Sequence, residues 1–468
     1  MTFVRNSSLF LNCISFACCV SMVSCAHHPT PKDAEATNTH PQTATTQVST
    51  VSATLTTEPS PGETTGTKIT VPSAQSQLPI VVPLPMITQA EFSTCINALS
   101  ENAKAAGISN TTITSTLAKA NFNSRVIELD RRQPEFSTTF ADYFNGRVTD
   151  QRVAQAQALM EKHQILLDKV VQQYGVPAHY LLAFWGLETN YGSFFGKFST
   201  VDSLATLACD ARRSSFFTGE LISALRILDE GTVTSDKMVG SWSGAMGNFQ
   251  FMPSAFLQHA VDYDGDNKRD LWNSTADATA SAAKFLQSLG WQTKNPWGYE
   301  VKLPVDFPFV EAGLKNIKLL SEWRKLGVTR ADNMLLPTTD LNASLLVPSG
   351  YNGPAFLVFD NFNVIMQWNR SEFYALAVGN LADRIAGAGK LVQPPPLDAP
   401  RLHRDQVIKL QEQLNQLGFN VGMPDGIFGP GTRRAISEFQ HKIGMVADGF
   451  PDKKMLGLLG VNLDAVKN

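Results

Sequence analysis

The stretch HYLLAFWGLETNYG, residues 179–192, contains the most informative pattern in the sequence. Its first nine residues are almost wholly apolar, and Glu188 follows them directly. An apolar run of this kind predicts a helix that is buried on all sides. A carboxylate in apolar surroundings is costly to ionise, so its pKa rises and it becomes a candidate proton donor near neutral pH. Taken alone, the run is a weak signal, because a glutamate at the end of an apolar helix is more often exposed or ion-paired.

Helical spacing dominates the rest of the folded region. Apolar residues recur every three or four positions over 92–103 and again over 153–174. The segments 343–347 and 355–359 predict two strands, separated by the turn sequence PSGYNGP. A final helix is expected from about 373 to 385. The sequence therefore predicts a mainly α protein with a small β element.

The N-terminal segment predicts export. Residues 1–25 place one arginine ahead of an apolar stretch, which is the layout of a signal peptide. The sequence MVSC, residues 22–25, resembles a bacterial lipoprotein box, so Cys25 is the candidate lipidation site. Acylation at Cys18, or cleavage without acylation, are the alternatives. The residue after Cys25 is Ala26 and not the aspartate that favours retention in the inner membrane. We therefore expect a periplasmic protein that is held by a lipid anchor in the outer membrane.

Composition divides the remaining chain and excludes several classes. Residues 26–86 are rich in Thr, Ser and Pro, which predicts a disordered tether, and residues 391–401 form a Pro-rich linker. A net charge of −3 over 468 residues excludes a strongly basic nucleic-acid binder, so we expect no nucleic-acid partner. Six cysteines are too few for a disulfide scaffold. Cys95 and Cys209 either pair or stay as free thiols.

Several motifs carry a family resemblance. The sequence WGLETNYG around Glu188 resembles the catalytic motif of lytic murein transglycosylases of the membrane-bound B type. Further matching motifs follow the order of that family. They are DRRQPEF (130–136), SLATL (203–207), ARR (211–213), GSWSGAMGNFQFMPS (240–254), NFNVI (361–365) and the stretch 368–378. The resemblance covers about 87–390.

The resemblance implies a lysozyme-like catalytic domain over residues 87–390. Such enzymes cut the β-1,4 bond from N-acetylmuramic acid to N-acetylglucosamine in peptidoglycan without water, and they leave a 1,6-anhydro end. Glu188 would act first as acid and then as base, with no cofactor. Ordinary glycosidases use two carboxylates, whereas the next acids after Glu188 are Asp202 and Asp210. A water-using muramidase and a non-catalytic wall-binding scaffold are the alternatives.

The resemblance also implies a set of residues around the substrate. Those expected to contact it are Ser241, Gln250, Arg212, Arg213, Trp368, Asn369 and Tyr374. The two arginines would hold carboxylates of the lactyl group or the peptide, or else form a solvated charged face. Trp368 stands where the family usually has tyrosine. Gly244 and Gly247 would let the backbone approach a sugar closely.

An acidic loop, DYDGDNKRD (262–270), predicts a structural calcium site. It carries oxygen ligands with the spacing that opens an EF-hand-like loop, although Asn267 occupies the glycine position. Asp277 would supply the late acidic ligand. The predicted ligands are the side chains of Asp262, Asp264, Asp266 and Asp277 and the carbonyl of Lys268. A metal-free acidic turn is the alternative.

The C-terminal residues 402–468 resemble a three-helix peptidoglycan-binding domain. Within them, DGIFG (425–429) and DGF (448–450) form a degenerate repeat. We therefore expect peptidoglycan glycan strands as the main partner, together with a membrane through the lipid anchor. Proteins of cell-wall synthesis or division are further expected partners.

Overall fold

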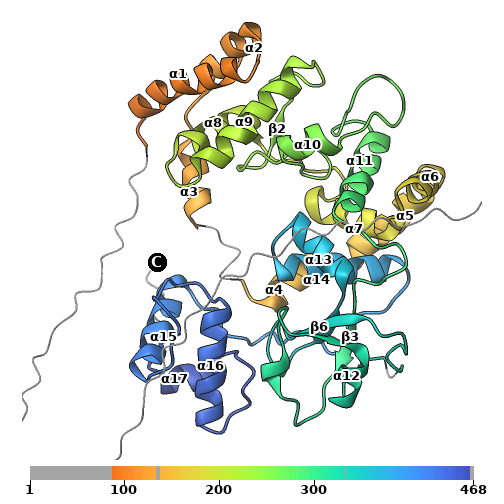
Figure 1. The fold of residues 1–468 in the computed structure, drawn as a ribbon, viewed down its shortest axis with the longest axis vertical. Helices are drawn as coiled ribbons and strands as arrows, with labels where there is room; N and C mark the ends of the chain where they lie inside the picture. The colour runs from red at the N-terminus through yellow and green to blue at the C-terminus, as the bar shows by residue number, and fades with distance from the viewer. Residues whose placement is uncertain (1–86, 133–137, 333, 464–468) are drawn as a thin grey trace, which may run out of the picture. The chain divides into compact units, whose positions relative to one another are not determined.

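The computed structural model describes residues 87–132, 138–332 and 334–463. Most of the described chain is helical, with a small sheet, as the sequence predicts (Figure 1). The predicted signal peptide, the tether and Cys25 lie outside the described residues. Within the described part of the chain, none of the helices combines the length and the apolar character needed to cross a bilayer.

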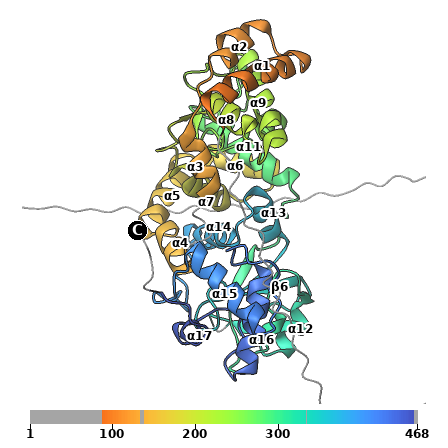
Figure 2. The same ribbon diagram turned by 90° about the vertical axis from the view of Figure 1, so that its left-hand side faces the viewer.

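The predicted buried helix is α7 (Ala178–Thr189), which begins after Pro177 and ends at Asn190 in a left-handed conformation. Every residue from Tyr180 to Leu187 is buried, so α7 forms the axis of the largest apolar cluster. Helices α5 and α14 pack against it (Figure 2). The other helices before it are α1 (Gln89–Ala105), α2 (Asn110–Ser115), α3 (Ser124–Arg132), α4 (Phe140–Arg147), α5 (Asp150–Lys162) and α6 (Gln164–Tyr174).

Six further helices after α7 contribute side chains to this apolar cluster. They are α8 (Thr200–Cys209), α9 (Ser214–Asp229), α10 (Pro253–His259), α11 (Thr275–Ser288), α13 (Asp360–Trp368) and α14 (Glu372–Ile385). The short strands β1 (Phe198–Ser199) and β2 (Val239–Gly240) pair antiparallel and bring the loop after α7 beside the loop after β2.

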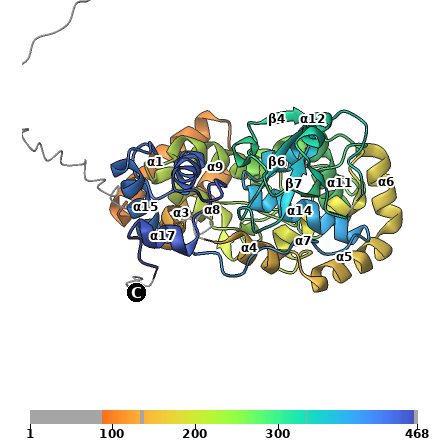
Figure 3. The same cartoon turned by 90° about the horizontal axis from the view of Figure 1, so that it is seen from below.

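A five-stranded antiparallel sheet interrupts the helices between α11 and α13. Its strand order is β4-β6-β7-β3-β5. The strands are β3 (Gly298–Lys302), β4 (Ile317–Leu319), β5 (Thr329–Arg330), β6 (Asn342–Leu346) and β7 (Ala355–Val358). Helix α12 (Leu320–Lys325) lies beside β4 and buries Trp323 in a second apolar cluster (Figure 3). The two predicted strands are β6 and β7, whereas the other three were not predicted.

The C-terminal module has three helices, α15 (Arg404–Gln416), α16 (Pro430–Lys442) and α17 (Lys453–Leu458). Their apolar faces meet in a third apolar cluster that includes Leu410, Ile436 and Leu456. Helix α16 begins at Pro430, which suits the first helical position because proline has no N–H to leave unpaired.

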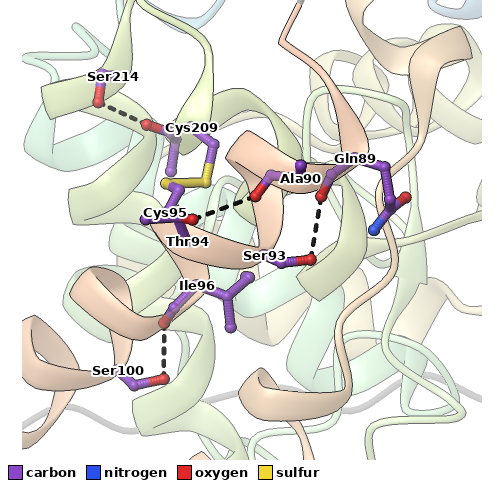
Figure 4. The surroundings of a disulfide bond; sticks show 10 residues. Gln89, Ala90, Ser93, Thr94, Cys95, Ile96, Ser100, Cys209 and Ser214 are labelled. Carbon is purple, nitrogen blue, oxygen red and sulfur yellow. Dashed lines mark hydrogen bonds between the residues drawn. A yellow bond between two sulfur atoms is a disulfide. The ribbon is translucent and has the colours of Figure 1, made fainter.

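A disulfide answers the question that the sequence left open for the two cysteines. Cys95 on α1 and Cys209 at the end of α8 are bonded, with their Cα atoms 5.9 Å apart (Figure 4). The bond closes a loop with a sequence separation of 114 residues. It therefore fixes the first described helix to the helical core.

We expect Cys95→Ser to destabilise the fold, because closing so long a loop restricts the unfolded chain by about 4–5 kcal/mol. Thermal unfolding with and without a reductant measures this. Reduced wild type should melt at the same temperature as the variant, and both below the oxidised protein. An oxidised wild type that melts no higher than its reduced form would contradict the prediction.

Candidate active site

Glu188 lies in the last turn of α7, where two aromatic side chains donate to one of its oxygens. The Trp368 indole Nε1 lies 3.0 Å from Glu188 Oε1, and the Tyr374 hydroxyl lies 2.5 Å from the same atom. Trp368 ends α13 and Tyr374 is in the first turn of α14. The consecutive helices α13 and α14 thus converge on a carboxylate oxygen of α7, which is far from them in sequence.

Burial dominates the electrostatics of this group. Desolvation raises the pKa of Glu188, and the hydrogen bonds from Tyr374 and Trp368 oppose that rise because they favour the charged form. Burial and the neighbouring Glu188 also raise the pKa of Tyr374 well above its ordinary value, which keeps the phenol as a donor. Glu188 is therefore a carboxyl whose proton is retained at higher pH than in water.

Trp368 is itself held by aromatic packing. Its ring centroid lies 4.8 Å from that of Phe184 on α7 and 5.0 Å from that of Phe285 on α11. Phe251 approaches it at 5.5 Å. Because rings from three other segments enclose the indole, its N–H has a fixed direction toward Glu188.

A pocket of about 270 Å³ opens beside Glu188. Its lining residues come from the end of α7, from the segment between α7 and β1 together with β1 itself, and from the loop after β2. They are Glu188, Phe194, Phe195, Gly196, Lys197, Phe198, Ser241, Trp242 and Gln250. Among these lining residues Glu188 is the single acid and Lys197 the single base.

The two loops approach at backbone distance. A Cβ on Gly196, which has φ of +105°, would lie 1.9 Å from the carbonyl oxygen of Gly240. Gly244 and Gly247 were predicted to let a sugar approach the backbone, but the space beside each glycine is filled by a leucine of the protein. A Cβ there would meet Leu204 at 2.5 Å or Leu271 at 2.9 Å, so packing within the protein accounts for both glycines.

Ser241 and Gln250 line the pocket, in the region where the family resemblance put them. The Ser241 hydroxyl accepts a hydrogen bond from the Ala245 amide at 3.1 Å. The Gln250 side-chain amide donates to the carbonyls of Phe195 (3.2 Å) and Gly247 (3.1 Å) and so ties the two loops together. Gln250 does this from a left-handed backbone with φ of +49°.

The two predicted arginines are engaged elsewhere. Arg212 and Arg213 both form ion pairs with Asp130, whose side chain is almost fully buried, and Arg212 also donates to the Asp130 carbonyl at 2.9 Å. They join α3 to the segment between α8 and α9 and are not among the residues that line the Glu188 pocket. Asn369 follows α13 and is exposed, and it does not line the pocket either.

Sequence reasoning missed the other face of the pocket. Phe194 is 57% exposed although it is apolar, and Lys197 forms no ion pair with any described residue. A run of three phenylalanines and a lysine directly after the glutamate motif was the available signal. The exposed ring provides a flat apolar surface, and the amine provides one positive charge at the pocket.

The other acids considered as a second carboxylate have partners of their own. The Asp202 carboxylate accepts from the Asn121 amide at 3.0 Å, and Asp210 pairs with Arg131 at 2.8 Å. Neither of them lines the pocket that Glu188 occupies.

The acidic loop gathers carboxylates as the sequence predicts. One oxygen from each of Asp262, Asp264, Asp266 and Asp277 lies within 4.8 Å of the others. Asn267 adopts the left-handed conformation, with φ of +66°, that the glycine position of such a loop requires. Such a set of hard oxygen donors suits Ca²⁺.

Family models match most of the described chain. Residues 91–383 match the transglycosylase SLT domain, and residues 403–459 match the putative peptidoglycan-binding domain. Over 245 residues the chain is 31% identical to membrane-bound lytic murein transglycosylase B of Escherichia coli. That alignment covers 51% of this chain and 65% of the relative's length.

Solved structures of the same class are similar over larger fractions. SltB3 from Pseudomonas aeruginosa in complex with NAG-anhNAM-pentapeptide is 43% identical, with a TM-score of 0.76 over 79% of this chain and 99% of that chain. The lytic transglycosylase Slt35 of E. coli in complex with calcium is 27% identical, with a TM-score of 0.55 over 64% of this chain and 93% of that one. This chain belongs to the transglycosylase SLT domain family.

Proposed function

We propose that this chain is a lytic transglycosylase that cleaves the bond from N-acetylmuramic acid to N-acetylglucosamine in peptidoglycan and leaves 1,6-anhydro ends. One observation carries the proposal. A single, partly buried carboxyl lines the pocket, with one oxygen held by two donors and no second acid among the lining residues. The family match and the similarity to a relative bound to a NAG-anhNAM-pentapeptide support the same substrate class.

The hydrogen bonds assign a role to each oxygen of Glu188. An indole N–H is a donor only, so Oε1 must act as an acceptor toward Trp368. Tyr374 donates to the same atom. The proton of the neutral carboxyl is therefore on Oε2, and we assign the proton transfer to that oxygen.

The reaction follows from that assignment. Glu188 Oε2 gives its proton to the glycosidic oxygen, and the bond from that oxygen to C1 of the muramic residue breaks. The muramic 6-hydroxyl then bonds to C1 and returns its proton to Oε2. Atoms balance without water, and the acid is regenerated. Most glycoside hydrolases use a second carboxylate as nucleophile or water base, and Asp202 and Asp210 are already held by other partners.

The surroundings of the pocket suit a saccharide that carries a peptide. The exposed ring of Phe194 provides an apolar face for a sugar, and Lys197 provides a positive charge for carboxylates of the muramic substituent. Trp368 and Tyr374 affect the reaction through their hydrogen bonds to Glu188. We assign Arg212 and Arg213 to the support of α3 through Asp130, rather than to the substrate.

We also propose the setting in which the enzyme works. Acylation at Cys25 would hold the chain at the outer membrane in the periplasm, in agreement with the membrane-bound relative. The C-terminal module would hold the enzyme on the wall polymer, which raises the local substrate concentration. Contacts with proteins of wall synthesis or division are part of this proposal.

The acidic loop is proposed to hold a structural Ca²⁺. Asp262, Asp264, Asp266 and Asp277 would supply side-chain oxygens, and Lys268 its backbone carbonyl. The calcium complex of a similar structure supports this choice of ion. When bound, the ion would balance the negative charge of the loop, and it takes no part in the proton transfers at Glu188.

Glu188→Gln should abolish cleavage, since an amide cannot exchange the proton, with a loss of about 100-fold or more. Mass spectrometry of digested peptidoglycan sacculi measures it, with Glu161→Gln on the surface of α5 as the control. Wild type and Glu161→Gln should give anhydro-muropeptides. Reducing muropeptides would establish a hydrolase instead, and sacculi that only sediment the wild-type protein would establish a scaffold.

Trp368→Phe should lower kcat by about tenfold, because one hydrogen bond to the carboxyl is lost. That bond lowers the pKa of Glu188. Its removal raises the pKa, so the alkaline limb of the pH–rate profile should move to higher pH. Trp368→Tyr restores a donor and should recover both values. Equal losses in the two variants, with no shift of the alkaline limb, would mean that the indole acts through packing alone.

Ca²⁺ should raise the melting temperature, and Asp264→Asn should remove the effect because the loop loses one anionic ligand. A ligand at about 100 times its Kd stabilises a fold by about 2.7 kcal/mol. Calorimetry with Ca²⁺, Mg²⁺ and a chelator measures it, with Asp236→Asn outside the loop as the control. A melting temperature unchanged by Ca²⁺ in the chelator-treated protein would establish a metal-free turn.

A further inference from the structure

The C-terminal module contains two turns built in the same way. In the first, the buried Gln411 side chain donates to Asp425 Oδ1 at 2.9 Å and to the Ile427 carbonyl at 3.1 Å. The same Oδ1 accepts from the Ile427 amide at 2.8 Å. Gly426 lies in the left-handed region, with φ of +75°. One carboxylate oxygen of Asp425 is thus used to build the turn.

The second turn repeats each of these contacts. The buried Gln440 side chain donates to Asp448 Oδ1 at 2.9 Å and to the Phe450 carbonyl at 2.8 Å. Asp448 Oδ1 accepts from the Phe450 amide at 2.9 Å, and Gly449 has φ of +77°. The degenerate sequence repeat is therefore a structural repeat.

The two turns differ in what occupies their outer face. Asp448 Oδ2 accepts the backbone N–H of Tyr351 at 2.9 Å, and Phe450 packs against the apolar cluster of the sheet. At the first turn no described residue donates to Asp425 Oδ2. The adjoining Ile427 is 45% exposed, and Met423 is 70% exposed. The second turn is filled by this chain's own loop, whereas the first is open.

The filled turn shows which chemistry such a turn accepts. Its occupant is a peptide segment that gives one amide N–H to the free carboxylate oxygen. Gly350, next to the donating residue, has φ of +77°, and a Cβ there would lie 2.5 Å from Asp448 Oδ2. This backbone conformation is strained for an L-residue, but a D-residue, its mirror image, adopts it without strain.

We propose that the open turn of Asp425 and Ile427 binds the stem peptide of peptidoglycan. An amide N–H of the peptide would bond to Asp425 Oδ2, and an apolar side chain would lie on Ile427. Stem peptides contain D-residues, which suits the backbone seen at the filled turn. Arg404 donates to the Asp425 carbonyl at 3.0 Å and places a positive charge beside the turn for the peptide's carboxylates. This inference rests on the proposed function for its choice of polymer.

The test measures sedimentation of the full chain with peptidoglycan sacculi, in a Glu188→Gln background so that the polymer stays intact. The added variant is Asp425→Asn, which keeps an acceptor for Gln411 and replaces the free oxygen with an amide donor. We expect affinity for intact sacculi to fall about tenfold, the effect of losing one hydrogen bond to a charged acceptor. Glu438→Gln on the exposed surface of α16 is the matched control and should bind as the parent does.

Sacculi stripped of stem peptides by an amidase separate the peptide from the glycan. The parent should bind them about as weakly as Asp425→Asn binds intact sacculi. If Asp425→Asn has a lower melting temperature than the parent, Ile427→Ser is used in its place, because it leaves the hydrogen bonds of the turn intact. Unchanged binding of both variants to intact sacculi, or equal binding of the parent to stripped sacculi, would overturn the proposal. Anhydro-product formation with Glu188 intact is measured separately, so failure of the proposed function is seen independently.

Discussion

The site depends on the balance between burial of the Glu188 carboxyl and the two hydrogen bonds that meet on its Oε1. Burial favours the neutral acid, and the donors Trp368 and Tyr374 favour the carboxylate. A carboxyl that must first give up a proton and then take one back needs both influences. Because both donors act on one oxygen, the other is left for the proton. The proposed chemistry thus requires no second acid and no cofactor.

The fold can be understood as the means of holding that balance. Glu188 and its two donors are separated by 180 and 186 residues in sequence. They meet because α7 is buried along its length and α14 packs directly against it. Aromatic rings from α7 and α11 fix the indole of Trp368. The disulfide between α1 and α8 stabilises the helical region that carries the ion pairs of Arg212 and Arg213.

The sequence predicted those helices and strands whose formation depends on a local pattern of apolar and turn residues. The apolar run over 179–187 predicted α7, and two short apolar runs separated by a turn sequence predicted β6 and β7. The short strands β4 and β5 gave no such pattern, because two or three residues carry no periodicity. The sequence could not decide whether Cys95 and Cys209 pair, since pairing depends on a tertiary distance. The charges in the sequence could not show that Arg212 and Arg213 both form ion pairs with Asp130. The family resemblance supplied the residues around Glu188, and their catalytic roles remain proposals.

Digestion of sacculi in water enriched with ¹⁸O tests whether one glutamate moves a proton out and back without water. Mass spectrometry of the released muropeptides measures isotope incorporation at the newly formed muramic ends. We expect these ends to carry no ¹⁸O, because the oxygen that bonds to C1 comes from the substrate's own 6-hydroxyl. Incorporation of one ¹⁸O atom at each new end would show that water attacks C1 and would contradict the proposed mechanism.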